Sequence, residues 1–504
     1  MRRWFYQSLG ILFAIIIGVT GYAGTLEELD TYFSEARVEW EIPGMAVAIV
    51  EDDSVVLARG YGTLTRGGDK QVDPHTLFAV ASNTKAFTAA LLGVLASENK
   101  LEWDDRVIDY LPRFHMNDGY VTRDIRIRDL LVHRSGLPTF GGDLLWIGGG
   151  FNSDEIVRRI RFMEPVAPFR AEYHYQNLMF LTAGEVAEAV SGHTWEVFLR
   201  NRILDQLGMD ETYPSITDLT GLGNVATPHE MVDSVITPIS YDSVDAVAPA
   251  AGLNSNVLDM AQWMRLNINR GVIDGRRILD SSLVEEMQSV QIPLEPSDLG
   301  KKRLGTDFSG YGLGWGISEY HGYKLVAHGG GLSGMISRQA FIPSEGIGVV
   351  VLTNFAPHNL TRAVTYRTLD ALLGLPETDW SEVYLQQRED DREEKAAEEK
   401  ELRKKRVEGT TPSVPLKKFA GKYHEDLSGD AHIVMEGNHL VFNLYPRFIG
   451  DLRHWNYNTF RVTWRNPIFD MPDETFLTFF LNEEGEVQNL EVTFYHPHTF
   501  VKTE

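Results

Sequence analysis

Alternating hydrophobic and polar positions first indicate strands near the two ends of a region that runs from Thr25 to about Leu375. Met45–Val50 and Ser54–Tyr61 flank a short acidic stretch and predict a β-hairpin. Later segments of the same kind predict further strands of a sheet: Leu325–Ala327, Met335–Ile342 and Ile347–Leu352.

Between these strands, apolar residues recur at the three- and four-residue spacing of an amphipathic helix. Four segments have this pattern: Lys85–Ser97, Asp124–Val132, Leu178–Val190 and Leu258–Asn267. Helices and strands therefore do not alternate regularly, as they would in a βαβ array. The pattern predicts an α+β fold in which a helical block is inserted between the first and last strands of an antiparallel sheet.

The pattern changes near Ser381, where the chain becomes almost entirely charged. Arg388–Glu408 contains 8 Lys or Arg and 9 Asp or Glu among 21 residues, with hardly any apolar face. Opposite charges recur four residues apart, which supports an isolated helix: Asp391 with Lys395, Glu399 with Arg403, and Glu401 with Lys405. We expect a solvated helical spacer here.

After Pro412 a two-residue period returns and predicts a separate all-β module of about 90 residues. The expected strands are Lys422–His424, Ala431–Met435, His439–Leu444, Thr459–Trp464, Phe476–Leu481 and Val487–Tyr495. Gly437 and Gly485 mark tight turns between them.

The N-terminus has the pattern of a secretory signal. Arg2 and Arg3 precede an uncharged stretch, Leu9–Ala23, whose 15 residues would cover only about 22 Å as a helix, short of a hydrocarbon core of about 30 Å. The aromatic residues at positions 4–6 would lengthen the span, so an uncleaved membrane anchor is the alternative. Either way we expect an exported protein, periplasmic or secreted. The expected organisation is a signal or anchor (1–24), the α+β domain (25–375), a charged helical linker (376–412) and the β module (413–504).

Composition narrows the possible partners and chemistry. The chain of 504 residues carries 47 Lys or Arg against 71 Asp or Glu, a formal charge of -24, which is the wrong sign for a nucleic-acid binder. The absence of cysteine excludes thiol nucleophiles, Cys-rich zinc sites, iron–sulfur clusters and disulfides. We expect no cofactor and no metal, because the His229–Asp233 segment lacks the second histidine of a zinc motif and His496–His498 lacks further ligands.

A serine followed three residues later by a lysine occurs twice. Ser82 follows an apolar segment and opens a long helix, so its hydroxyl and the Lys85 ammonium should meet at a buried helix start, where the helix dipole favours negative charge. Ser97 and Lys100 lie at the polar end of the same helix and should be hydrated. A serine needs a base to become a nucleophile, and a lysine one turn away can serve if burial lowers its pKa from about 10.4.

Two further segments offer partners for this pair. Tyr175, followed by Asn177, precedes a helix, and its phenol becomes a usable base only beside a cation such as Lys85. His328 and three glycines end a strand and let a substrate approach the backbone. A dinucleotide site is rejected because a strand follows, and a lipase site because no G-x-S-x-G exists in the chain.

These motifs together resemble the penicillin-recognising serine hydrolases, in the branch of class C β-lactamases, D-stereospecific peptidases and related esterases. Ser82-x-x-Lys85, Tyr175-x-Asn177 and His328-x-Gly330 occur in the family's order, and their first residues are spaced 93 and 153 positions apart. Further segments match as well: Leu130–Pro138, Gln206–Thr212, Gly252–Ser255 and Tyr311–Trp315. The C-terminal module is similar to the lipocalin-like β-barrel often appended to such domains.

The resemblance implies an acyl-enzyme route and a role for each matching residue. Ser82 would attack a carbonyl, Lys85 and Tyr175 would handle its proton, and the backbone N–H groups of Ser82 and Gly331 would bind the oxyanion. Asn177 would hold the substrate amide or the Lys85 side chain, and His328 and Gly330 would line the substrate site. Which of Lys85 and Tyr175 is the acylation base stays open.

One departure from the family bears on the substrate. Class C β-lactamases carry Lys-Thr-Gly where this chain has His328-Gly329-Gly330, so a fixed cation that would pair with a substrate carboxylate is replaced by a mostly neutral histidine. We therefore expect a hydrolase of esters or D-amino-acid amides. The alternatives are a D-alanyl-D-alanine carboxypeptidase or β-lactamase and, in another class, a non-catalytic cell-wall or ligand-binding protein. The expected partner is a small-molecule or peptide substrate; the sequence leaves the oligomeric state open.

Overall fold

The computed structural model describes residues 24–466, 475–494 and 496–504. The predicted signal or anchor segment Leu9–Ala23 lies outside these residues, as does Tyr495 at the end of a predicted strand. Within the described part of the chain, no helix has both the length and the hydropathy needed to cross a membrane.

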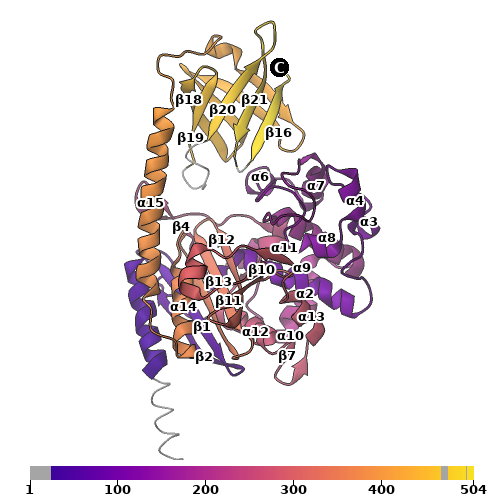
Figure 1. The fold of residues 1–504 in the computed structure, drawn as a ribbon, viewed down its shortest axis with the longest axis vertical. Coiled ribbons are helices and arrows are strands. Elements are labelled where there is room, and N and C mark those ends of the chain that lie inside the picture. The colour runs from indigo at the N-terminus through magenta and orange to yellow at the C-terminus, as the bar shows by residue number, and fades with distance from the viewer. Residues whose placement is uncertain (1–23, 467–474, 495) are drawn as a thin grey trace, which may run out of the picture.

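An antiparallel sheet of eight strands forms the centre of the larger part of the molecule, in the order β2-β1-β14-β13-β12-β11-β10-β9 (Figure 1). The strands are β1 (Gly44–Glu51), β2 (Ser54–Gly62), β9 (Ile292–Leu294), β10 (Ser309–Tyr311), β11 (Gly316–Tyr320), β12 (Tyr323–Leu332), β13 (Met335–Ile342) and β14 (Ile347–Thr353). The predicted hairpin and later strands are confirmed. The first strand lies beside the last, since Met45 pairs with Thr353.

Three two-stranded pairs lie outside this sheet: β3 (Phe78–Ala79) with β6 (Asn254–Ser255), β4 (His229–Val232) with β5 (Val235–Pro238), and β7 (Val272–Ile273) with β8 (Arg276–Arg277). The short β3–β6 pair matters for the site because β3 leads into the turn that carries Ser82.

The helical block lies between β2 and β9 in sequence and packs on one face of the sheet. Its main α-helices are α2 (Thr84–Ser97), α3 (Val107–Tyr110), α4 (Gly119–Asp124), α5 (Ile127–Leu130), α6 (Leu144–Ile147), α7 (Ser153–Arg159), α8 (Asn177–Ser191), α9 (Trp195–Leu199), α10 (Asp205–Leu207), α11 (Ala248–Ala251), α12 (Val257–Ile268) and α13 (Ser281–Met287). A large apolar core joins this block to the sheet, and Phe87 of α2 stacks on Trp263 of α12 within it. The predicted α+β class is confirmed.

One predicted helix is wrong. Asp124–Val132 was expected to be continuous, but the chain forms α4 and α5 with Ile125 extended between them. The Asp129 carboxylate accepts a hydrogen bond from the backbone N–H of Arg126 at 2.9 Å and so starts a new helix there. A capping interaction of this kind competes with helix continuation, and periodicity alone does not reveal it.

A second core covers the opposite face of the sheet. A helix over residues 24–39 and α14 (Leu360–Leu373) pack there, through apolar residues such as Phe33 and Val364. The first turns of α15 (Trp380–Lys404) join them, because Trp380 and Tyr384 are buried in the same core. The rest of α15 is charged and exposed, and it runs as a strut to the C-terminal module (Figure 1).

The C-terminal module is a closed barrel of eight strands: β15 (Gly421–Glu425), β16 (Gly429–Glu436), β17 (His439–Tyr445), β18 (Phe448–Asn456), β19 (Thr459–Trp464), β20 (Phe476–Leu481), β21 (Val487–Thr493) and β22 (Pro497–Lys502). The sequence analysis missed β18 and β22. Gly437 and Gly485 have φ of 58° and 77°, as tight turns require. Aromatic and aliphatic side chains fill the interior.

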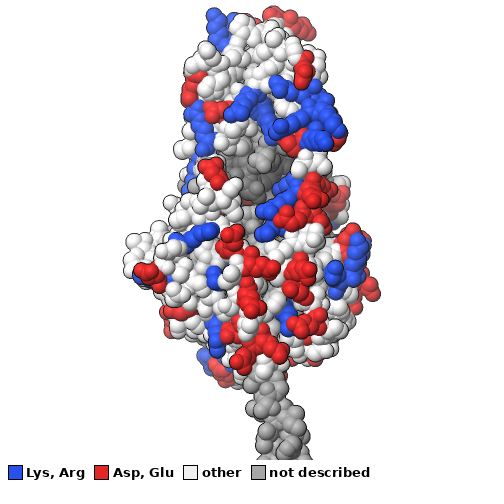
Figure 2. Space-filling view, turned by 90° about the vertical axis from the view of Figure 1, so that its left-hand side faces the viewer, with Lys and Arg blue, Asp and Glu red and all other residues white. Residues whose placement is uncertain are grey.

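The barrel also contacts the helical block. Leu144 of α6 lies in the apolar core of the barrel, and Phe448 of the barrel packs against Gly148. Arg159 of α7 donates hydrogen bonds to the carbonyl oxygens of Asp426 and Leu427 at 3.0 and 2.6 Å. Elsewhere the surface is hollowed between the two parts (Figure 2).

Candidate active site

Ser82 lies in a short 3₁₀ turn, Ala81–Asn83, that leads into α2. Ala81 before it has φ of 48°, a left-handed conformation that costs a non-glycine residue free energy and persists only where the surroundings enforce it. Such strain is typical of a functional turn.

Strands β12 and β13 hold this turn in place. A Cβ at Gly330 would lie 2.2 Å from the carbonyl oxygen of Val80, so only glycine permits this approach. Ser337 of β13 donates to the Val80 carbonyl oxygen at 2.7 Å and accepts a hydrogen bond from Asn83 at 2.7 Å. The sequence analysis expected the glycines after His328 to let a substrate approach the backbone. In the structure, Gly330 instead permits close approach of the Val80 carbonyl oxygen.

Lys85 is fully buried, and its amine contacts three oxygen atoms. Its Nζ lies 3.0 Å from Ser82 Oγ, 2.7 Å from Asn177 Oδ1 and 3.1 Å from the carbonyl oxygen of Ala250. Burial lowers the pKa of Lys85 to about 7, although the negative charge of Asp143 opposes part of that change. A neutral amine in this position donates to the two carbonyl oxygens and presents its lone pair to the serine hydroxyl.

Tyr175 is also buried beside this pair. Its hydroxyl is hydrogen-bonded to Ser82, and Lys85 Nζ lies 4.7 Å from the centre of its ring. Burial raises the pKa of Tyr175 far above its ordinary value, and the contact with Ser82 offsets only part of the rise. The phenol therefore stays protonated and is a proton donor in the resting site.

The backbone before α8 positions Tyr175. His133, which has φ of 58°, accepts a hydrogen bond from the backbone N–H of Gln176 at 2.9 Å through Nδ1. The centre of its ring lies 4.2 Å from the centre of the Tyr175 ring. Burial lowers the pKa of His133 well below its usual range, so the neutral ring supports Tyr175 by packing and by this hydrogen bond.

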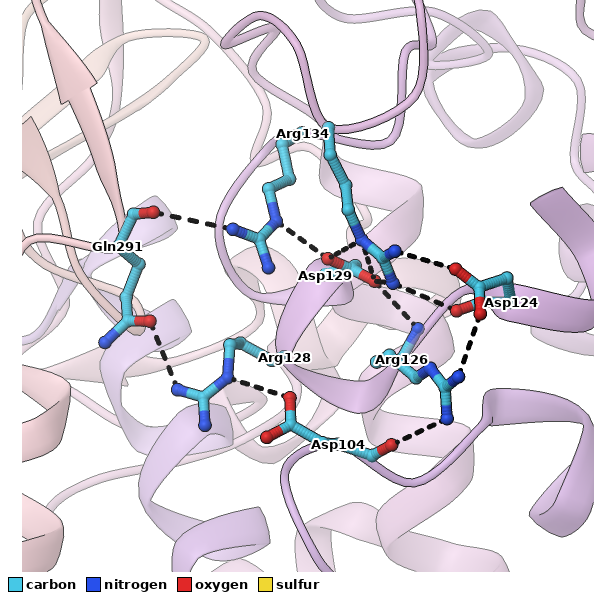
Figure 3. Close-up of polar contacts among 8 residues, drawn as sticks. Asp104, Asp124, Arg126, Arg128, Asp129, Arg134 and Gln291 are labelled. Atoms are coloured by element: carbon cyan, nitrogen blue, oxygen red, sulfur yellow. Dashed lines mark hydrogen bonds and ion pairs between the residues drawn. The ribbon is translucent and has the colours of Figure 1, made fainter.

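A cluster of ion pairs around Asp129 fixes the two loops that meet here (Figure 3). Asp129 is fully buried and accepts from Arg134 Nε at 2.7 Å and from Arg170 Nη2 at 2.6 Å. Arg170 also bonds Asp124 at 2.7 Å, and its backbone N–H donates to the Arg134 carbonyl oxygen at 2.9 Å. The segment that ends in Tyr175 is thereby tied to the segment that carries His133.

His328 lies in β12 with both ring nitrogens engaged. Nδ1 donates to the Gly329 carbonyl oxygen at 2.6 Å, and Nε2 accepts from the Tyr311 hydroxyl at 2.8 Å. Burial, with the positive charge of Lys85 second, lowers the pKa of His328 to about 3. The expected neutral state at pH 7 therefore extends to acidic pH, and protonation of His328 is not a means of supplying a cation at mildly acidic pH.

The remaining predicted residues fall into two groups. Asn177, at the first turn of α8, joins Lys85 as expected, whereas Gly331 is exposed at the end of β12 opposite Ile336. Ser97 and Lys100 of the second Ser-x-x-Lys pattern are exposed, and Lys100 pairs with Glu98 at 2.8 Å. No cluster of potential metal ligands occurs within the described ranges.

Sequence reasoning missed Asp143. This side chain is 4% exposed and accepts a hydrogen bond from Asn177 Nδ2 at 2.7 Å, so a continuous chain of contacts runs from Ser82 through Lys85 and Asn177 to a buried carboxylate. The signal that was available is the pair of glycines before it, because Gly142 has φ of 81°.

Comparison with known proteins agrees with this arrangement. The sequence model of a family described as "Beta-lactamase" matches residues 29–373. A second family, described as a domain of unknown function (DUF3471), matches residues 405–502.

Similar proteins cover between 64% and 94% of this chain. The unguisins hydrolase of Aspergillus campestris is 31% identical over 431 residues, covering 79% of this chain and 76% of its own. Penicillin-binding protein 4 of Amycolatopsis lactamdurans is 28% identical, covering 64% of this chain and 83% of its own. The octameric penicillin-binding protein homologue from Pyrococcus abyssi has the same fold, with a TM-score of 0.64 at 22% identity over 94% of this chain and 99% of that one.

Proposed function

The chain belongs to the β-lactamase family and is a serine hydrolase of that family, and from this premise we propose that it cleaves an ester or a D-amino-acid amide through an acyl-enzyme on Ser82. The observation that carries the proposal is the 3.0 Å contact between Ser82 Oγ and a Lys85 amine whose pKa burial has lowered to about 7. A base of this pKa is close to the optimum for catalysis at neutral pH.

The contacts suggest which residue accepts the serine proton and which donates a proton to the leaving group, a question that the sequence left open. Lys85 takes the proton of Ser82 as Oγ bonds to the substrate carbonyl carbon. Tyr175, kept protonated by burial, then gives its proton to the leaving oxygen or nitrogen. The ammonium of Lys85, whose Nζ lies 4.7 Å from the centre of the Tyr175 ring, returns the former serine proton to the phenolate. Water afterwards cleaves the ester bond to Ser82 and regenerates its hydroxyl.

The oxyanion assignment follows the family resemblance. The N–H groups of Ser82 and Gly331 would receive the developing negative charge, and each donor of this type contributes about 3 to 4 kcal/mol in other hydrolases. The strained turn at Ala81 and the close approach of Gly330 to the Ser82 nitrogen support a fixed position for the first donor.

The neutral state of His328 supports uncharged acyl groups as substrates. A lysine in this place would supply a permanent cation, whereas His328 spends both nitrogens on Tyr311 and Gly329. The second candidate, a D-alanyl-D-alanine carboxypeptidase or β-lactamase, is favoured by the similarity to penicillin-binding protein 4. A non-catalytic binding role is disfavoured because the Ser82–Lys85–Tyr175 contacts are complete.

The test of the nucleophile uses both Ser-x-x-Lys patterns. A fluorophosphonate probe followed by peptide mapping should label Ser82 in the wild type and in Ser97→Ala, the matched control, and should label nothing in Ser82→Ala. Labelling that survives in Ser82→Ala would disprove the assignment.

The substrate class is tested with a panel of short-chain p-nitrophenyl esters, D-amino-acid p-nitroanilides, a D-alanyl-D-alanine peptide and a chromogenic cephalosporin. We expect the highest kcat/KM on an uncharged ester or amide. A higher value on the cephalosporin or the peptide would favour the second candidate. Unguisins belong in the panel because the fungal relative is named for their hydrolysis.

We also propose that the chain is exported, on the sequence pattern of residues 1–24 alone. Cell fractionation with the full chain and with residues 2–23 deleted should place activity outside the cytoplasm only for the former. Equal distribution of the two would reject export.

A further inference from the structure

A buried carboxylate close to the nucleophile has no role in the reaction as described so far. Asp143 is buried in the helical block and shares Asn177 with Lys85: Asn177 Oδ1 accepts from Lys85 at 2.7 Å while Asn177 Nδ2 donates to Asp143 at 2.7 Å. We propose that Asp143 is a positioning residue whose negative charge, transmitted through the Asn177 amide, fixes Lys85 and sets its basicity in the hydrolytic reaction.

The amide is oriented by this contact. An asparagine side chain can present either its oxygen or its nitrogen, and a carboxylate accepts only from the nitrogen. Asp143 therefore forces the Asn177 oxygen toward Lys85, where it accepts one amine proton. With the Ala250 carbonyl oxygen accepting a second, the lone pair of the neutral amine is left for the Ser82 hydroxyl.

The backbone holds Asp143 in this position from two sides. A Cβ at Gly142 would lie 2.5 Å from Leu178 of α8, so glycine permits the close approach that brings Asp143 to Asn177. On the other side, Leu144 is anchored in the core of the barrel, and the Asp143 carbonyl oxygen accepts from Ile147 at 3.0 Å. A residue held this tightly is suited to orient a partner.

Asp143 is the charged group that acts on the pKa of Lys85. The other titratable groups near Lys85 are Tyr175, His133 and His328, and burial keeps all three neutral near pH 7. Burial raises the pKa of Asp143 to about 6, and contacts with Trp146 and Asn177 and the charge of Lys85 offset part of the rise. The carboxylate is therefore ionised where Lys85 titrates, and it raises the pKa of Lys85 against the effect of burial.

This inference rests on the proposed function, and its test measures both separately. The observable is the second-order rate constant for labelling of Ser82 by the fluorophosphonate probe between pH 5 and 10, which needs no natural substrate. In the wild type this rate should rise with pH through an inflection near 7, because the neutral form of Lys85 is the base. Absence of Ser82 labelling in the wild type would defeat the proposed function itself.

Asp143→Asn keeps the size of the side chain and an oxygen that can accept from Asn177, but removes the charge. We expect the inflection to move down by about one pH unit or more and the high-pH plateau to fall about tenfold, because a less basic amine takes the serine proton less readily. A purely structural role would lower the labelled fraction without moving the inflection. An inflection at the wild-type pH would therefore overturn the inference while leaving the proposed function intact.

Two variants complete the test. Asp143→Glu retains the negative charge and should keep the inflection within about 0.3 pH units of the wild type; a shift as large as that of Asp143→Asn would overturn the inference, as would a wild-type profile for both. Asp259→Asn is the matched control, since burial also raises the pKa of Asp259 to about 6 but its partners are Thr212 and the Glu211 backbone. Its pH profile should equal that of the wild type, and a comparable shift would mean that removal of any buried carboxylate has this effect.

Discussion

Two buried carboxylates in the helical block have opposite surroundings. Asp129 is met directly by the guanidinium groups of Arg134 and Arg170, with hydrogen bonds of 2.7 and 2.6 Å (Figure 3). The Asp143 carboxylate instead accepts a hydrogen bond from the neutral side-chain amide of Asn177. The nearest compensating cation, Lys85, contacts the other end of that amide. Direct pairing with guanidinium groups neutralises a buried carboxylate and holds loops together. A buried carboxylate without a direct cationic partner, such as Asp143, has a raised pKa, and such groups are typical of functional sites.

The most severe test of this comparison is removal of the fully paired carboxylate. Asp129→Ala leaves two guanidinium groups without their buried partner and should lower the free energy of unfolding by about 3 to 5 kcal/mol. Urea denaturation followed by circular dichroism measures the loss. Asp143→Asn, which keeps its hydrogen bond, should lose much less, and equal losses would show that the two carboxylates do not differ in this way.

The second test removes both charges of the incompletely paired site. Lys85→Met with Asp143→Asn replaces an ammonium and a carboxylate by uncharged groups of similar size, and we expect a gain in unfolding free energy of about 1 to 4 kcal/mol together with loss of hydrolysis. The sign follows from the pKa of Lys85, which burial lowers to about 7: the folded state disfavours the ammonium that the unfolded chain holds at neutral pH. A marked loss of stability would mean that the pair supports the fold.

The same contrast explains how far sequence reasoning reached. Ser82 and Lys85 were singled out because their spacing at a helix start is local, whereas Tyr175 was singled out by the order of motifs that the family resemblance supplied. The structure brings these three side chains together. Asp143 was missed because its place beside the site depends on a hydrogen bond to Asn177, 34 residues later, and on a glycine turn that brings the two residues together.

The errors in secondary structure have a similar origin. Helix Asp124–Val132 was wrongly extended because the Asp129 side chain caps the backbone at Arg126. Strand β18 was missed because Gly450 and the polar residues that follow interrupt its alternation, although a Cβ at Gly450 would meet Val462 at 2.3 Å in the neighbouring strand. In both cases a side-chain or cross-strand contact decides the conformation.

The third test concerns a buried group kept neutral without any counter-charge. His358 accepts from the Leu360 N–H at 3.0 Å, and burial lowers its pKa to about 3. The unfolded chain takes up a proton near pH 6.5 and the folded chain does not, so stability present above pH 6.5 is lost as the pH falls toward 3. In His358→Asn, which keeps an acceptor for Leu360, the loss between pH 6 and 4 should be smaller by about 1.4 kcal/mol per pH unit. Urea denaturation at each pH measures it, and parallel curves would contradict the prediction.

The smallest effect is expected where two arginines meet a partly exposed carboxylate. Glu399 of α15 pairs with Arg403 and Arg461, each at 2.7 Å, which repeats the chemistry of Asp129 at the surface. Glu399→Gln should change the free energy of unfolding by no more than about 1 kcal/mol, because water screens such pairs. A loss as large as that of Asp129→Ala would show that burial is not what separates the two sites.

The pairing of β1 with β14 has a consequence for the order of folding. Partners such as Met45 and Thr353 are separated by most of the hydrolase domain, so the central sheet closes only after a very long loop has formed. Strand β12, which supports the Ser82 turn through Gly330, also comes late in the chain. Most barrel strands pair with their neighbours in sequence. During synthesis, the turn that carries Ser82 therefore emerges early but acquires its strained geometry late, and the barrel has the simpler route to its native contacts.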